Sequence, residues 1–276
     1  MNSMAKSESS SRIVTSVVAV ISAAALAVSL IAAGFAACAV PDVSTKALAS
    51  VYSTDDASPF TKDELVAAAV QTKHYTIDDN DKAAVYATIA AINAQEALAG
   101  MGAPKIDATA NYAAGELSGE QIAALETAFD AASERYVLTP DAVSHLDDVF
   151  GVVQAAKWWL LAAVIAACVG CTATAFRGGK RLLGRVLAGA GVSVLAVFAL
   201  LAAWVAIDFD GFFTQFHSLF FAAGTWTFSW DSLLICMYPP EFWVGMGAIW
   251  LVVTVACCVV CITIGRLLRK GSTQKR

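Results

Sequence analysis

Charged residues are scarce in this chain and are absent from four long stretches. Only 15% of the 276 residues are Asp, Glu, Lys or Arg, whereas about 25% is usual in a soluble domain. The stretches that lack all four residue types are Ile13–Val40, Trp158–Phe176, Val186–Ile207 and Phe242–Gly265. With 58% apolar residues gathered in such blocks, the composition excludes an ordinary soluble globular protein.

Each of the four stretches is long enough to cross a membrane. About 20 residues, at a rise of about 1.5 Å each, span a hydrocarbon core of about 30 Å. Backbone groups find no water in lipid, so each stretch should be a helix. The sequence therefore predicts an all-α membrane protein with four transmembrane helices, at residues 13–40, 158–176, 186–207 and 242–265. The first is longer than the apolar region of a cleaved signal and is interpreted as an uncleaved anchor.

The distribution of charge predicts how the chain is oriented in the membrane. Positive residues are concentrated in residues 1–12, 177–185 and 266–276, whereas residues 41–157 hold 18 of the 23 acidic residues. Short positively charged segments remain in the cytoplasm. We therefore expect a multi-pass protein with cytoplasmic N- and C-termini and a basic cytoplasmic loop at 177–185. Residues 41–157 and 208–241 should lie outside. The basic segments follow from topology, so nothing indicates nucleic-acid binding.

Cysteine is absent from residues 41–157, so disulfides cannot stabilise the predicted outer domain. Cys168 and Cys171 have a spacing that can bind zinc or perform redox chemistry. No histidine or second hydrophilic pair lies nearby in the sequence, and small apolar cysteines also pack well between membrane helices. We favour the packing interpretation and predict no metal site.

Helix-start signals indicate that residues 41–157 form a mostly helical domain. Thr61 with Glu64, and Ser118 with Gln121, have the spacing of a capping box, in which each side chain bonds to the other's backbone N–H.

Two further helices are expected in this domain. Asp79 or Asn80 is predicted to cap an alanine-rich helix that ends near Ala99. Pro140 follows a threonine, a combination that favours a helix start. This last helix is expected to continue without a break into the span at Trp158.

An uncharged, aromatic segment at residues 211–230 requires separate treatment. Its length would permit a fifth span, but that span would move the basic C-terminal segment outside, against the charge distribution. We therefore interpret it as a re-entrant or interfacial helix at the outer leaflet. Non-helical backbone at such depth is tolerated only against protein or a wet cavity, which predicts a pocket there.

The chain has only three histidines, and all lie on the predicted outer side. His74 lies in a polar stretch and is interpreted as a surface residue. His145 shares a helical face with Asp148, whose carboxylate could fix the imidazole tautomer, although many structural helices carry such a pair. His217 lies in the aromatic segment, where an ionisable group is costly unless it is paired or functional. Because histidine is the usual general base near neutral pH, His145 and His217 are the candidate catalytic residues.

Two motifs around these histidines resemble a known family. The first is His145-Leu-Asp-Asp148-Val149, and the second is Phe213-Thr-Gln-Phe216-His217-Ser-Leu219-Phe220-Phe221, followed by Trp226, Asp231 and Pro239-Pro-Glu-Phe242. With the four-span plan, they resemble the bacterial integral membrane proteins that include the lipoprotein intramolecular transacylases. Two features differ from that family. Phe150 stands where a lysine is usual, and the outer domain is longer.

The resemblance implies a bacterial cell-membrane enzyme that moves the sn-2 acyl chain of a diacylglyceryl lipoprotein to its N-terminal cysteine amine. It implies catalytic roles for His145 and His217, with Asp148 orienting His145, and needs no cofactor. The aromatic residues implied to line the acyl-chain cavity are Phe213, Phe216, Phe220, Phe221 and Trp226. The partners would be the lipoprotein substrate and the membrane. If one substrate uses both imidazoles, they should lie within about 10 Å of each other.

Two other functions are compatible with the sequence. The chain could be a non-enzymatic envelope protein whose acidic outer domain binds a partner. It could also be a transporter or channel subunit, although the predicted spans carry no charge at the midplane and no paired broken helices.

Overall fold

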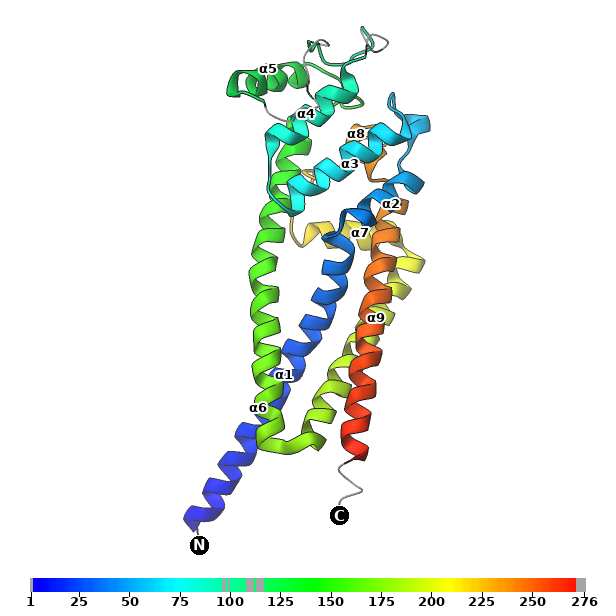
Figure 1. Ribbon diagram of the computed structural model, residues 1–276. Helices are drawn as coiled ribbons and strands as arrows, with labels where there is room; N and C mark the ends of the chain where they lie inside the picture. Colours follow the sequence, from blue (N-terminus) through cyan, green and yellow to red (C-terminus); the bar gives the residue numbers. More distant parts are fainter. Residues whose placement is uncertain (1, 96–97, 99, 108–111, 113–116, 272–276) are drawn as a thin grey trace. The chain divides into compact units, whose positions relative to one another are not determined.

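The computed structural model describes residues 2–95, 98, 100–107, 112 and 117–271. Within those residues all regular secondary structure is helical (Figure 1). The elements are α1 (Asn2–Ala39), α2 (Asp42–Tyr52), the short 3-10 helix η1 (Asp55–Ala57), α3 (Lys62–Ile77), α4 (Lys82–Asn93), α5 (Gly119–Asp130), α6 (Pro140–Ile207), α7 (Phe209–Ser218), α8 (Leu233–Met237) and α9 (Pro240–Lys270). The chain divides into two compact units: Met1–Ala37, Ala156–Phe212 and Ile249–Arg276 form the first, and Cys38–Ala155 and Phe213–Ala248 form the second.

Three helices of the described chain, α1, α6 and α9, are long and apolar enough to cross a membrane. In the most apolar window of each, only 28%, 22% and 17% of the residues are buried by protein. Apolar side chains exposed over such lengths require lipid as their solvent. The protein is therefore an all-helical membrane protein.

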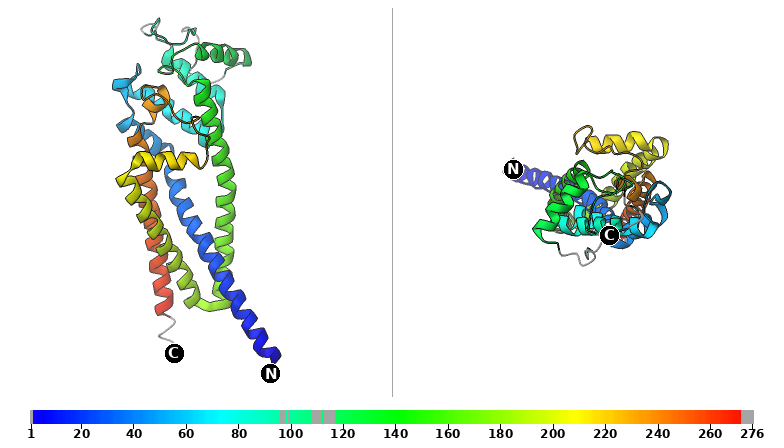
Figure 2. Two further views of the ribbon diagram at one scale, coloured as in Figure 1. Left: turned by 180° about the vertical axis from the view of Figure 1, so that it is seen from behind. Right: turned by 90° about the horizontal axis from the view of Figure 1, so that it is seen from above.

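The 68-residue helix α6 contains two of the predicted spans. Gly179 interrupts it with φ 73° and ψ 178°, a backbone conformation that glycine adopts readily because it has no Cβ. Near this glycine the ribbon of α6 reverses direction (Figures 1 and 2). Residues 177–185, predicted to be a loop, are therefore helical on both sides of a one-residue break. The Arg and Leu residues there are good helix formers, which explains how helix persists through the polar segment.

In the first unit, the second arm of α6 packs against α9 and α1 around a small core (Figure 2). Phe198 and Cys258 are buried there, and the indole N–H of Trp250 donates a hydrogen bond to the carbonyl of Ile31 at 3.0 Å. Cys168, for which packing between helices was predicted, is instead exposed.

In the second unit, α3 packs against α2, α4 and α8. The first turns of α6 complete its core through Ala142, Val143 and Leu146. This core positions the two segments that carry the candidate histidines.

Most of the predicted helix starts in this unit are confirmed. Both capping boxes are present, at Thr61 and Ser118, and α6 begins at Pro140 and continues past Trp158. The cap of α4 was predicted wrongly: it is Asp81, because Asn80 adopts a left-handed φ of 57° and so belongs to the preceding turn. α4 ends at Asn93, and Ala99, where its end was expected, lies outside the described residues.

Candidate active site

His145 lies near the start of α6 and is 8% exposed. The hydroxyl of Thr139 accepts a hydrogen bond from the backbone N–H of Ala142 at 3.3 Å, which fixes the beginning of the helix. Ala142 and Leu146, three residues before and one after, are buried in the core. The register of α6 therefore turns the imidazole inward.

The two aspartates that follow His145 make different interactions. Asp147 accepts hydrogen bonds from the hydroxyl of Tyr75 and, at 3.2 Å, from the amide of Asn80, and these tie α6 to the end of α3. Asp148 is exposed, and no hydrogen bond joins it to His145 in the described structure. Its effect on the imidazole is electrostatic, and the orienting role assigned to it stays a prediction.

His217 lies in the last turn of α7, and its hydrogen bond defines the tautomer of the neutral ring. Its Nδ1 is 2.8 Å from the carbonyl oxygen of Phe213. A carbonyl can only accept, so Nδ1–H is the donor, and Nε2 of the neutral ring carries the free electron pair. The arrangement leaves Nε2 available as a base.

The aromatic helix is shorter than the segment that suggested it. α7 ends at Ser218, and turns connect it to α8. One of these turns contains Gly224 at φ 88°, a conformation that an α-helix cannot include. Residues 219–230, predicted as part of a helix, therefore form a loop.

This loop is held to the helical domain mainly through α8. The N–H of Leu233 donates to the carbonyl of Glu134 at 2.8 Å, and the N–H of Thr54 donates to that of Cys236 at 2.9 Å. Arg135 adds an ion pair to Asp231 at 3.3 Å. Leu233 is itself fully buried. These contacts fix the position of the loop that follows His217.

The structure brings the two candidate histidines together. The ring centroids of His145 and His217 are 6.3 Å apart, inside the expected limit. They come from residues 72 positions apart in the sequence, and only tertiary packing could join them.

Aromatic side chains surround the two imidazoles. The ring of Phe221 is 4.8 Å from His145, and Phe213 and Trp226 are 4.0 and 4.8 Å from His217. The Phe216 ring is 5.7 Å from His217 and is 42% exposed.

The Phe220 ring, by contrast, contacts Phe216 and Phe221 rather than either histidine. It is 49% exposed, so its position is peripheral to the histidine pair. Four of the five aromatic residues predicted to line a cavity are thus neighbours of the histidines.

Burial favours the neutral form of both imidazoles. Burial, followed by the nearby His217, lowers the pKa of His145 from 6.5 to about 4, and Asp148 offsets only part of this effect. Burial also lowers the pKa of His217, against the opposing effect of its hydrogen bond to Phe213. A neutral imidazole can accept a proton at one nitrogen and donate a hydrogen bond from the other.

Two buried nitrogen atoms at this site have no hydrogen-bond partner among the described residues. They are Nδ1 of His145 and Nε1 of Trp226. Buried polar atoms without partners are uncommon in folded proteins and often occur where a ligand supplies the missing bond. The indole N–H can only donate, so its partner must be an acceptor such as a carbonyl oxygen or an oxyanion.

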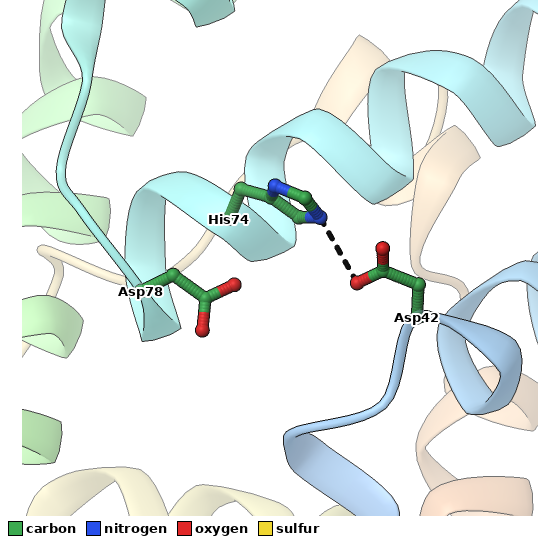
Figure 3. A group of neighbouring side chains, drawn as sticks. All are labelled: Asp42, His74 and Asp78. Carbon is green, nitrogen blue, oxygen red and sulfur yellow. Dashed lines mark hydrogen bonds and ion pairs between the residues drawn. The ribbon is translucent and has the colours of Figure 1, made fainter.

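A second group of side chains, away from the histidine pair, has the ligand types of a metal site. Ligand atoms of Asp42, His74 and Asp78 lie within 4.8 Å of one another (Figure 3). The ammonium of Lys73, however, is 3.0 Å from Asp42 and 2.8 Å from Asp78. The chain therefore supplies the positive charge itself, and the cluster is an ion-pair network that joins α2 to α3. His74 takes part in it through a 2.9 Å contact with Asp42.

A comparison with protein families identifies the chain. The family model of the lipoprotein intramolecular transacylase Lit matches residues 62–243, which is more than half of the sequence and includes both histidines. The chain belongs to this family. Lit proteins are intramolecular acyltransferases of the membrane that act on lipoproteins. A comparison with curated proteins finds no significant match.

Solved structures of Lit from Bacillus cereus have the same fold. One is 14% identical and matches with a TM-score of 0.61, over 95% of this chain and 98% of that one. A variant with one histidine replaced by arginine is 15% identical, with a TM-score of 0.63 over 98% and 99% of the two chains. A variant with histidine replaced by alanine is also 15% identical, with a TM-score of 0.61 over 99% and 100%. This chain is thus an integral, multi-pass membrane protein of the Lit family.

Three features of the site were not predicted from the sequence. Phe228, whose ring is 5.8 Å from His145, was not selected, although it lies two residues after Trp226 in an aromatic run. Trp226 was selected for its ring and not for its N–H. Asp147 was passed over in favour of Asp148, and no sequence signal distinguishes these adjacent carboxylates.

Proposed function

We propose that this Lit-family protein transfers the sn-2 acyl chain of a diacylglyceryl lipoprotein to the amine of its N-terminal cysteine, and that His145 and His217 catalyse the transfer. The amine and the ester belong to one molecule, so much of the catalysis is orientation. The amine nitrogen bonds to the acyl carbon as the ester C–O bond breaks, which gives an amide and a free glycerol hydroxyl.

The observation that carries the proposal is the 6.3 Å separation of two neutral imidazoles in an aromatic setting. His217 is the base: its Nε2 takes the proton from the attacking amine and returns it to the departing alkoxide. His145 donates a hydrogen bond to the oxyanion of the tetrahedral intermediate, as a neutral imidazole can. The fixed Nδ1–H of His217 supports this division of roles.

The indole of Trp226 is a second donor to the oxyanion in this proposal. Its Nε1 has no partner within the described chain, and its ring is 4.8 Å from that of His217. Asp148 orients His145 through the charge of its carboxylate, without a hydrogen bond. The exposed rings of Phe216 and Phe220, with Phe213 and Phe221, hold the acyl chain.

The same proposal includes the topology expected from charge. Four helices cross the membrane, at residues 13–40, 158–176, 186–207 and 242–265. Both termini and the basic turn around Gly179 face the cytoplasm, and residues 41–157 and 208–241 lie outside as the helical domain and an interfacial aromatic segment. The reversal of α6 supports two crossings within that one helix (Figure 1).

Mass spectrometry of lipoprotein N-termini tests the function directly. The chain is expressed in a bacterial host that lacks such an enzyme, and N-acyl, monoacylglyceryl cysteine is expected to appear. His145→Gln and His217→Gln should each abolish the product, whereas His74→Gln, which changes the third histidine, should not. Unchanged diacylglyceryl termini in the presence of well-expressed, folded protein would refute the proposal. Loss of product in all three variants would show that the assay reports folding.

A further inference from the structure

Five basic side chains converge on one open pocket in the first unit. Arg181 and Arg185 come from α6, and Arg266, Arg269 and Lys270 come from α9. The open pocket has a volume of about 470 Å³. Its lining contains no acidic residue.

Close packing of two glycines brings these cations together. A Cβ on Gly184 would lie 2.5 Å from the carbonyl oxygen of Gly265, and a Cβ on Gly265 would lie 2.6 Å from that of Gly184. Only residues without a side chain permit such an approach. The arginines next to each glycine therefore meet in one place. Membrane orientation requires positive charge on these segments, but it does not require the charges to converge.

The four arginines of this pocket take part in none of the ion pairs found among the described residues. Moreover, residues 158–207 and 242–276 contain no Asp or Glu at all. Like charges held together repel, so a bound anion would stabilise this group of arginines.

We propose that this pocket binds the headgroup phosphate of an anionic phospholipid. Arginine forms paired hydrogen bonds with phosphate, and basic pockets between membrane helices are suited to anionic headgroups. Leu267 and Ile264 lie beside the arginines on α9 and are 63% and 46% exposed, which offers an apolar surface to the acyl chains. A free phosphate ion would use the cations but not this surface. The inference rests on the proposed membrane topology and not on the catalytic roles of the histidines.

Native mass spectrometry of the purified full chain tests the assignment. Protein in a neutral detergent is mixed with phosphatidylglycerol or phosphatidylcholine, and the retained lipid is measured. We expect preferential retention of phosphatidylglycerol, and a loss of about tenfold or more in its affinity in the Arg266→Gln/Arg269→Gln variant. Lys157→Gln/Lys180→Gln removes two positive charges outside the pocket and should retain the lipid as the unaltered protein does.

Two further measurements separate the alternatives. Inorganic phosphate at millimolar concentration should not displace the lipid, and full displacement would show that the pocket binds a free ion. Equal retention of the two lipids, or equal retention by the protein and its Arg266→Gln/Arg269→Gln variant at unchanged melting temperature, would overturn the proposal. Acyl transfer measured in neutral detergent should be the same in both proteins, so failure here is distinct from failure of the proposed reaction.

Discussion

Protonation of His145 should destabilise the folded protein as the pH falls below 6.5. Burial holds the pKa of this imidazole near 4, so the folded state binds a proton less readily than the unfolded state does. As the pH falls, the free energy of unfolding decreases wherever the unfolded state binds more protons than the folded state. For this depressed histidine pKa, the loss begins at the unfolded value of 6.5 and is complete below about 4. The charges that act on the ring are those of His217 and Asp148.

The magnitude follows from the two pKa values. A tenfold change in an equilibrium corresponds to about 1.4 kcal/mol, so lowering the pH from about 8 to about 5 should cost about 2 kcal/mol through His145 alone. For a chain of this size, that is an apparent melting temperature lower by about 4–8 °C. His145→Gln cannot take up this proton and should lack this part of the decrease.

The assay is thermal unfolding in detergent, followed by tryptophan fluorescence at several pH values. The substitution also changes stability at every pH, so the informative quantity is the slope of the melting temperature against pH, compared between the unaltered protein and His145→Gln. Between about pH 6.5 and about pH 5, this slope should be smaller in the variant. Identical slopes would refute the reasoning that the imidazole is buried in its neutral form.

Three further predictions concern the site and its support. Trp226→Phe keeps an aromatic ring but removes the N–H, and the single-turnover rate of acyl transfer should fall about 10²-fold with little change in melting temperature; an unchanged rate would exclude the indole as a donor. Leu233→Ala should lower the free energy of unfolding by about 2–5 kcal/mol, since this side chain is fully buried, and denaturant titration would measure it. Because the ammonium of Lys73 already pairs with both Asp42 and Asp78, EDTA should change neither the melting temperature nor the rate; a shift in either would indicate a bound metal.

Helix caps and helix breaks show which parts of the fold could be predicted from neighbouring residues in the sequence. Capping at Thr61 and Ser118 and the start of α6 at Pro140 depend on neighbours within a few residues, so they were predicted correctly. The cap of α4 was misplaced because Asn80 can enter either a cap or a left-handed turn. The break at Gly179 was taken for a nine-residue loop because charge marks a change of environment and not the end of a helix.

The candidate site was only partly predictable. His217 was selected because a lone ionisable group in an aromatic segment is costly, and that argument needs no structure. Asp147 and Asp148 differ in which carboxylate accepts the hydrogen bond from Tyr75, a contact between residues 72 positions apart in the sequence. The contact between Phe228 and His145 likewise joins segments that are distant in the sequence, so it could not be predicted from local residues.

The sequence alone determined that the chain is helical and membrane-embedded, because long uncharged stretches cannot be solvated by water and must satisfy their backbone hydrogen bonds internally. Its motifs also determined the family. Only the tertiary structure decided that two histidines from separate helices lie 6.3 Å apart and that burial keeps both neutral. It also decided that five cations meet beside a pair of glycines. Distances and burial arise from packing between remote segments, and no local pattern of residues encodes them.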